Sequence, residues 1–199
     1  MKKRSYIKLN NVIFEPEEHK YFLDKREYPS YSKIVKHFGM TPDYELFGNE
    51  TSRTFGQAVH HLCTLYDKDD LGNYDPQLEP WLNGYKRFLK AYNPKWELIE
   101  QPLVSKVWGF AGTPDRYGII KKRALVDFKT GTPEPSHDLQ TGAYKILIEE
   151  NLKVKVQERC SLYLLPNDFR LLPHTNKSDR SVFIGLVQAY NFKKIHKLC

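Results

Sequence analysis

The chain has 199 residues, a formal net charge of +7 and a hydrophobic content of 40%. This length suits one domain with a sizeable core, and this hydrophobic content excludes wholesale disorder. No apolar run is long enough to span a bilayer, and the basic start Met1–Arg4 is not followed by the apolar segment of a signal peptide. Three widely spaced cysteines, Cys63, Cys160 and Cys199, do not suggest a disulfide framework, so we expect a reducing, cytoplasmic setting.

The first elements predicted along the chain are a small hairpin and a short helix. Val12–Phe14 and Lys20–Leu23 have the composition of two short strands. Ser32–Phe38 is predicted to be a helix that is capped near Ser30 or Ser32 and ends at Gly39.

Two longer amphipathic helices are expected next, over Thr51–Tyr66 and Pro76–Tyr92. The first carries the adjacent residues His60 and His61, whose side chains point about 100° apart on a helix, so only one can face a given site. Spacing alone does not choose between them.

The second half of the chain predicts a sheet with two further helices. A helix from Ser136 to about Glu150 and a final helix from Ser178 or Asp179 to Ile195 follow from cap residues and periodicity. The expected extended segments are Trp96–Ser105, Val107–Gly112, Tyr117–Ile120, Ala124–Phe128, Arg159–Leu165 and Phe169–Leu172.

The most informative residues are Asp127 and Lys129, which lie two positions apart on an otherwise apolar strand. They therefore share one face of the strand, while Val126 and Phe128 point to the other face. Both faces look covered, and charges held there are costly unless they pair, bind a metal or do chemistry.

A second carboxylate is expected close by. Lys121–Arg123 forms a short turn, and a turn that pairs Ile120 with Ala124 places Asp115 opposite Lys129 and diagonal to Asp127. A slip of one residue would move Asp115 to the wrong face.

Two converging carboxylates can share a hard cation such as Mg²⁺ or Mn²⁺. Such a cation lowers the pKa of bound water and offsets charge on a phosphoryl group. Lys129 could position or deprotonate that water, or stabilise a negative transition state. A purely structural Asp–Lys ion pair in a hairpin is the alternative, and these residues alone leave both interpretations open.

Four short motifs follow one another along the chain, namely Gly56–His60, Gly112–Asp115, Leu125–Gly131 and Gln140–Tyr144. In order and spacing they resemble the PD-(D/E)xK nuclease superfamily and its RecB-like exonuclease branch. The N-terminal residues His19–Tyr21 and Tyr28–Ser32 more loosely resemble the opening of phage and mitochondrial exonucleases of that branch.

The resemblance implies an α/β fold with a central mixed β-sheet flanked by helices, a restriction-endonuclease-like core. It predicts one domain over residues 1–199, with the hairpin and short helix at about 1–50. The implied activity is that of a Mg²⁺- or Mn²⁺-dependent DNA exonuclease in recombination, repair or processing. A phage-encoded protein acting in the host cytoplasm fits this expectation, with recombination or replication proteins as further partners.

The resemblance also assigns roles to particular residues. Asp115, Asp127 and Lys129 are the implied catalytic residues, and the implied metal ligands are His60, Asp115, Asp127 and the backbone carbonyl of Phe128. The remaining implied positions are supporting or DNA-contacting ones, namely Gln140, Tyr144 and Glu100, of which Glu100 could equally be a solvated strand residue.

The net positive charge suits a polyanionic partner such as single- or double-stranded DNA. Three cysteines fall short of the four-cysteine set that holds an iron–sulfur cluster in some RecB-like relatives, so no such cluster is expected. Two alternatives remain: a structure-specific or restriction-type endonuclease, and a non-catalytic DNA- or protein-binding module on the same fold.

Overall fold

A computed structural model of the chain describes residues 11–40 and 50–198. Its centre is a five-stranded sheet in the order β10-β9-β8-β7-β4. Strands β8 and β9 pair in parallel, whereas the other neighbours pair antiparallel, so the sheet is mixed. The strands are β4 (Lys95–Ile99), β7 (Arg116–Ile119), β8 (Arg123–Lys129), β9 (Glu158–Leu165) and β10 (Asp168–Pro173).

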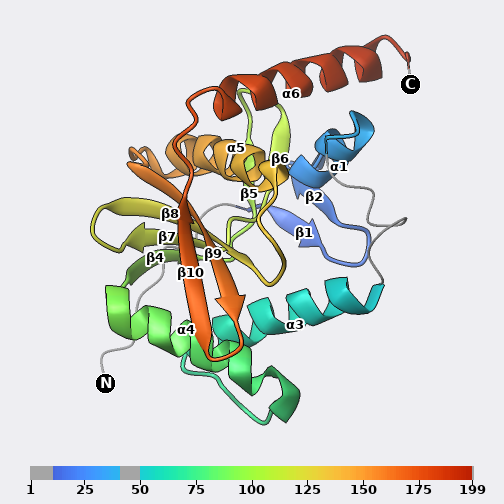
Figure 1. Cartoon of the computed structure of the whole chain (residues 1–199). Helices are drawn as coiled ribbons and strands as arrows, with labels where there is room; N and C mark the ends of the chain where they lie inside the picture. The colour runs from blue at the N-terminus through green and yellow to red at the C-terminus, as the bar shows by residue number, and fades with distance from the viewer. Residues whose placement is uncertain (1–10, 41–49, 199) are drawn as a thin grey trace.

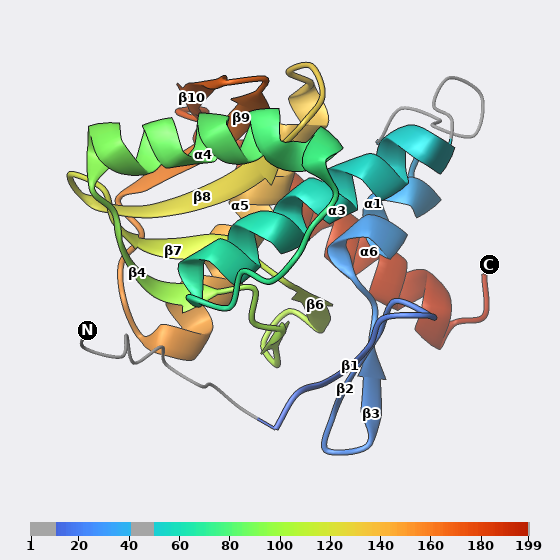
Figure 2. The same ribbon diagram turned by 90° about the horizontal axis from the view of Figure 1, so that it is seen from below.

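Helices cover both faces of this sheet. Helices α3 (Glu50–Asp67) and α4 (Glu79–Tyr92) lie on one face, and α5 (Pro135–Leu152) and α6 (Asp179–Ile195) lie on the other side (Figures 1 and 2). A 3₁₀ turn, η1 (Pro76–Leu78), precedes α4, so the helix predicted from Pro76 starts with a separate turn. The predicted α/β fold with a central mixed sheet flanked by helices is confirmed.

Alternation along β8 divides the core into two parts. Leu125 packs with residues of α5 and α6, whereas Val126 and Phe128 pack with α3 and α4. This is the period of two that a strand imposes, and it places Asp127 on the face that α5 covers.

The N-terminal part forms a separate three-stranded sheet and a short helix. Its strands are β1 (Ile13–Glu15), β2 (Lys20–Leu23) and β3 (Arg26–Tyr28), and helix α1 (Tyr31–His37) follows. Ser30 caps α1 by accepting a hydrogen bond from the Lys33 N–H, as one of the two predicted caps would. The predicted hairpin and helix are therefore present, and the parts of the predicted 1–50 region at residues 1–10 and 41–49 lie outside the described residues.

Three sequence-based expectations about local structure are wrong, and the first is the single extended segment Trp96–Ser105, which divides into β4 and a second strand on another sheet. The extended segment predicted from Val107 contains a turn, and only Phe110–Gly112 forms a strand, β6. This strand pairs with β5 (Leu103–Ser105) in a two-stranded sheet outside the central one. The N-cap of α5 is Glu134 and not Ser136, because Glu134 forms a capping box with His137 and Pro135 occupies the first turn.

The predicted pairing of β7 with β8 is also shifted. Gly118, and not Ile120, pairs with Ala124. Extending this register places Asp115 opposite Asp127 and not opposite Lys129. A shift of two residues preserves the face of every side chain, so Asp115 stays on the predicted face.

No helix in the described part of the chain combines the length and apolar composition that crossing a membrane requires.

Candidate metal-binding and catalytic site

Asp127 and Lys129 lie together at the carboxyl end of β8. The Asp127 side chain is 2% exposed, and the Lys129 Nζ lies 2.5 Å from its Oδ2. This oxygen has an ion-pair partner but receives no hydrogen bond in good geometry. Burial raises the pKa of Asp127 to about 6, with Lys129 opposing the shift and the Asp115 charge adding to it.

Asp115 meets the same end of β8 from the start of β7. Its Oδ2 accepts a 2.6 Å hydrogen bond from the Phe128 backbone N–H. Burial alone would raise the pKa of Asp115, but His60, Lys129 and this backbone donor together lower it. The two strands thus bring two carboxylates and one ammonium group to one place.

Helix α3 contributes His60 to this place. Its Nδ1 lies 3.6 Å from Asp115 Oδ1, and its ring packs edge-on against Phe128 with centroids 5.8 Å apart. His61 is exposed, so His60 is the histidine that faces the carboxylates. Gly56, one turn earlier, allows the close approach, since a Cβ there would lie 3.0 Å from Thr130 Oγ1 just after β8.

Helix α5 supplies the two polar residues that the Gln-x-x-x-Tyr spacing singles out. Gln140 Oε1 accepts a 2.8 Å hydrogen bond from Lys129 Nζ, and Gln140 Nε2 donates to the Tyr144 hydroxyl at 3.1 Å. Tyr144 is buried, and burial raises the pKa of its hydroxyl well above the usual range. Gly112 makes room for its ring, because a Cβ there would lie 2.7 Å from a ring carbon.

Glu100 lies at the edge of this cluster, directly after β4. Its backbone N–H donates to the Asp115 carbonyl at 2.9 Å, and its φ of 42° is unusual for a non-glycine residue. Its carboxylate is 26% exposed and lies 3.9 Å from Arg116. Glu100 is therefore near Asp115 through the backbone, while its side chain faces a buried arginine.

That buried arginine was not singled out from the sequence. Arg116 has no exposed side-chain surface and donates to Asp67 Oδ2 at 2.8 Å, to Thr64 Oγ1 at 2.9 Å and to the Asp115 carbonyl at 2.7 Å. Its guanidinium also lies 4.7 Å from the centre of the Phe128 ring. Arg116 therefore ties α3, which carries His60, to both strands of the hairpin. The signal in the sequence was a charged residue at the start of a predicted buried strand, directly after the candidate ligand Asp115.

The donor set suits a hard divalent cation in its chemistry. It comprises two carboxylates, one imidazole and the Phe128 carbonyl, and Asp127 Oδ2 is buried without a hydrogen bond. Among the described residues, however, no three His, Cys, Asp or Glu side chains already stand as a complete cation cage. In this structure the Lys129 ammonium occupies the position beside Asp127 Oδ2 that a cation would take.

A second constellation has the spacing of a hydrolase triad, but its serine is buried. Ser161 Oγ lies 2.8 Å from His174 Nε2, and His174 Nδ1 lies 2.5 Å from Asp138 Oδ1. Ser161 is completely buried, so no substrate can reach its hydroxyl. This row of contacts joins β9, the segment after β10 and α5, and its role is structural.

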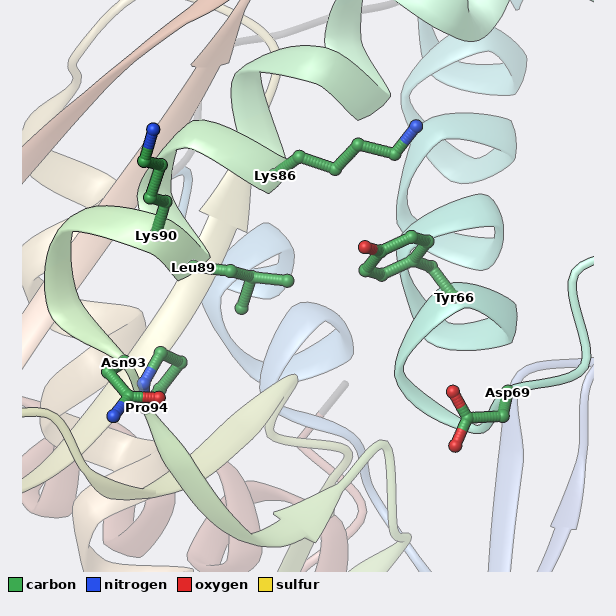
Figure 3. A pocket seen from close by; sticks show the side chains of 7 residues that line it. All are labelled: Tyr66, Asp69, Lys86, Leu89, Lys90, Asn93 and Pro94. Carbon is green, nitrogen blue, oxygen red and sulfur yellow. The ribbon is translucent and has the colours of Figure 1, made fainter. Parts of the chain in front are cut away.

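A hollow between α3 and α4 contains none of the candidate residues. It has a volume of about 390 Å³ and is open at the surface, with Lys86 extending towards the Tyr66 ring at 5.6 Å (Figure 3). Its remaining lining residues are Asp69, Leu89, Lys90, Asn93 and Pro94.

Comparison with known proteins gives a likeness in structure and none in sequence. No protein-family model matches the chain, and no curated protein matches it by sequence. A crystal structure described as "Putative exonuclease" from Eubacterium rectale aligns with a TM-score of 0.50 and 14% identity, covering 84% of this chain and 76% of that chain. The crystal structure of SSO0001 aligns with a TM-score of 0.42 and 16% identity over the same shares, a score too low to support an argument. At 14% identity the first likeness shows the fold alone.

Proposed function

We propose that this protein is a metal-dependent deoxyribonuclease of the PD-(D/E)xK superfamily, RecB-like branch, that degrades DNA from its ends. The observation that carries the proposal is the convergence of Asp115, Asp127 and Lys129 from two paired strands at one end of the sheet. A purely structural ion pair would not need a second buried carboxylate beside it, because like charges brought together are unfavourable. The nuclease-like fold supports the same conclusion.

His60, Asp115, Asp127 and the Phe128 carbonyl would hold Mg²⁺ or Mn²⁺. When bound, the cation supplies a water of lowered pKa and offsets negative charge on the phosphoryl oxygens. The protein fixes the orientation of Asp115 before any cation binds, since the Phe128 N–H and His60 hold its two oxygens.

Lys129 is proposed to assist the attack of water on phosphorus. Gln140 sets its position: the amide nitrogen of Gln140 donates to Tyr144, so the amide oxygen is left to accept from the Lys129 ammonium. An ammonium held this way can orient the attacking water or stabilise charge that builds up in the transition state. Tyr144 and Gln140 therefore act through Lys129.

The test uses end-labelled DNA, single- and double-stranded, linear and covalently closed, incubated with Mg²⁺ or Mn²⁺. Linear DNA is expected to lose its ends while circles remain intact. Lys129→Ala should slow the release roughly 10²–10⁴-fold, the usual contribution of a positioned acid or base. Lys25→Ala is the matched control, because Lys25 is exposed in the turn between β2 and β3 and lies outside the cluster.

Two outcomes would overturn parts of the proposal. If the protein melts cooperatively, and is therefore folded, but DNA is unchanged in every tube, the enzyme proposal fails and a binding module remains. Cutting of closed circles would retain the metal-dependent nuclease but replace the exonuclease with an endonuclease.

A further inference from the structure

A groove lies at the end of the sheet away from the candidate site. It has a volume of about 730 Å³ and is formed by the turn between β7 and β8, the start of β9, helix α5 and the segment that joins β10 to α6. Five lysine or arginine side chains line it against one carboxylate, that of Glu158. The cationic residues are Lys121, Lys145, Arg159, Lys177 and Arg180.

Two of these cations are already paired within the protein. Arg159 lies 2.7 Å from Asp179 Oδ2, and Lys145 lies 3.6 Å from Glu149. The carboxylate of Glu158 is itself paired with a lysine beside the groove at 3.0 Å. The lining therefore contains no unmatched negative charge.

The other three cations remain available. Within the described part of the chain, no carboxylate lies within ion-pair distance of Lys121, Lys177 or Arg180, and all three side chains are exposed. Lys121 lies over the ring of Tyr92, 5.6 Å from its centre, at the rim of the same groove. Three uncompensated positive charges around one concave surface create a local potential that attracts anions.

The wall that carries two of these cations is firmly held. The segment between β10 and α6 runs beside α5 (Figure 1), and Arg159 donates across this contact to the carbonyls of Asp138 and Asn176 at 3.0 and 2.7 Å. The N-terminus of α6 lies here as well, and Ser178 at its N-cap makes no side-chain cap hydrogen bond. Lys177 and Arg180 flank that cap, next to Asn176 and Asp179, which Arg159 contacts.

We propose that this basic groove binds the phosphate backbone of a nucleic acid at a distance from the candidate site. Strand β9 connects the two places: Glu158 lines the groove, and Tyr163 pairs with Lys129 five residues further on. At about 3.3 Å a residue this separation is roughly 17 Å. One strand of a duplex advances about 3.4 Å per nucleotide, so a duplex that reaches both places spans about five base pairs.

Binding in the groove does not depend on hydrolysis, so the test is made with the full chain in EDTA. A fluorescently labelled 20-base-pair duplex is titrated at several salt concentrations with the parent protein and with Lys177→Gln/Arg180→Gln. The groove variant is expected to bind severalfold more weakly, and the slope of log affinity against log salt should fall by about 2, one for each lost phosphate contact. Lys25→Gln/Lys68→Gln is the matched control, because both residues are exposed, lie outside the groove and carry the same charge.

Three other results would contradict the groove proposal. An equal loss in the groove and control variants would mean that net charge alone is responsible. Binding to anionic lipid vesicles without binding to the duplex would assign the groove to a different partner. A duplex bound with an unchanged salt slope would place its phosphates elsewhere. If the slope falls as expected but added Mg²⁺ or Mn²⁺ gives no cleavage, the groove stands and the nuclease proposal fails.

Discussion

Replacing Arg116 by methionine tests how the candidate site is supported. The guanidinium has no exposed surface and makes hydrogen bonds to Asp67, Thr64 and the Asp115 carbonyl. Methionine fills most of its volume but leaves the Asp67 carboxylate buried beside an apolar side chain. Removing one partner of a buried ion pair costs about 3–5 kcal/mol. For a domain of this size, that corresponds to a fall in melting temperature of roughly 6–20 °C.

The measurement is urea unfolding, followed by circular dichroism, of the parent and three variants. Arg123→Met is the matched control, because Arg123 is 40% exposed and solvent screens its pair with Glu97, so its loss should change the stability little. The double variant Arg116→Met/Asp67→Leu removes both charges and should recover part of the lost stability. A cost below about 1 kcal/mol for Arg116→Met, or no recovery in the double variant, would refute the claim that this pair anchors α3 to the hairpin.

Three further results are expected. Gly118→Ala should destabilise the protein by about 1–3 kcal/mol, because its Cβ would lie 2.1 Å from a backbone oxygen of β4. Gly185→Ala is the control in the same urea titration: its Cβ would meet open space on α6, so it should stabilise the protein by about 0.5–1 kcal/mol. Burial and nearby positive charge lower the pKa of His137 to about 3, against 6.5 when exposed. The stability that neutral His137 contributes is therefore complete above pH 6.5 and is lost as the pH falls towards 3. Urea unfolding midpoints measured at each pH should fall less over this range for His137→Gln than for the parent. Burial raises the pKa of the Cys160 thiol to about 12 and raises that of the Cys63 thiol further. In a variant without the C-terminal cysteine, both thiols should therefore react with a thiol reagent only after unfolding. Rapid labelling of the native protein would contradict their burial.

The sequence was sufficient for most of the elements and for the two carboxylates and the lysine that gather at the hairpin. Asp127 and Lys129 could be placed on one face because the period of a strand is fixed by geometry. The pairing of Asp115 was two residues off, since a three-residue turn does not by itself determine where the ladder begins. The Asp115 side chain nevertheless lies on the predicted face of the sheet, because a register shift of an even number of residues does not change the face.

Other features depend on contacts between segments that are distant in the chain. Spacing could not decide between His60 and His61, whereas the packing of α3 against the hairpin decides it. Arg116 reads in the sequence as a misplaced charge, and its partner Asp67 lies 49 residues earlier. No local pattern connects such residues, so their pairing becomes evident only in the fold.

The central claim is that Asp127 and its neighbours hold a divalent cation while Lys129 is left to assist hydrolysis. Titration calorimetry with Mn²⁺ separates these roles more directly than cleavage does. We expect Asp127→Asn to weaken Mn²⁺ binding by more than the roughly 10–100-fold that loss of an outer-shell partner costs. Lys129→Gln should bind Mn²⁺ at least as well as the parent, because it removes the ammonium that lies 2.5 Å from Asp127 Oδ2, and yet should cleave DNA roughly 10²–10⁴-fold more slowly. Equal Mn²⁺ affinity in the parent and Asp127→Asn would contradict the account.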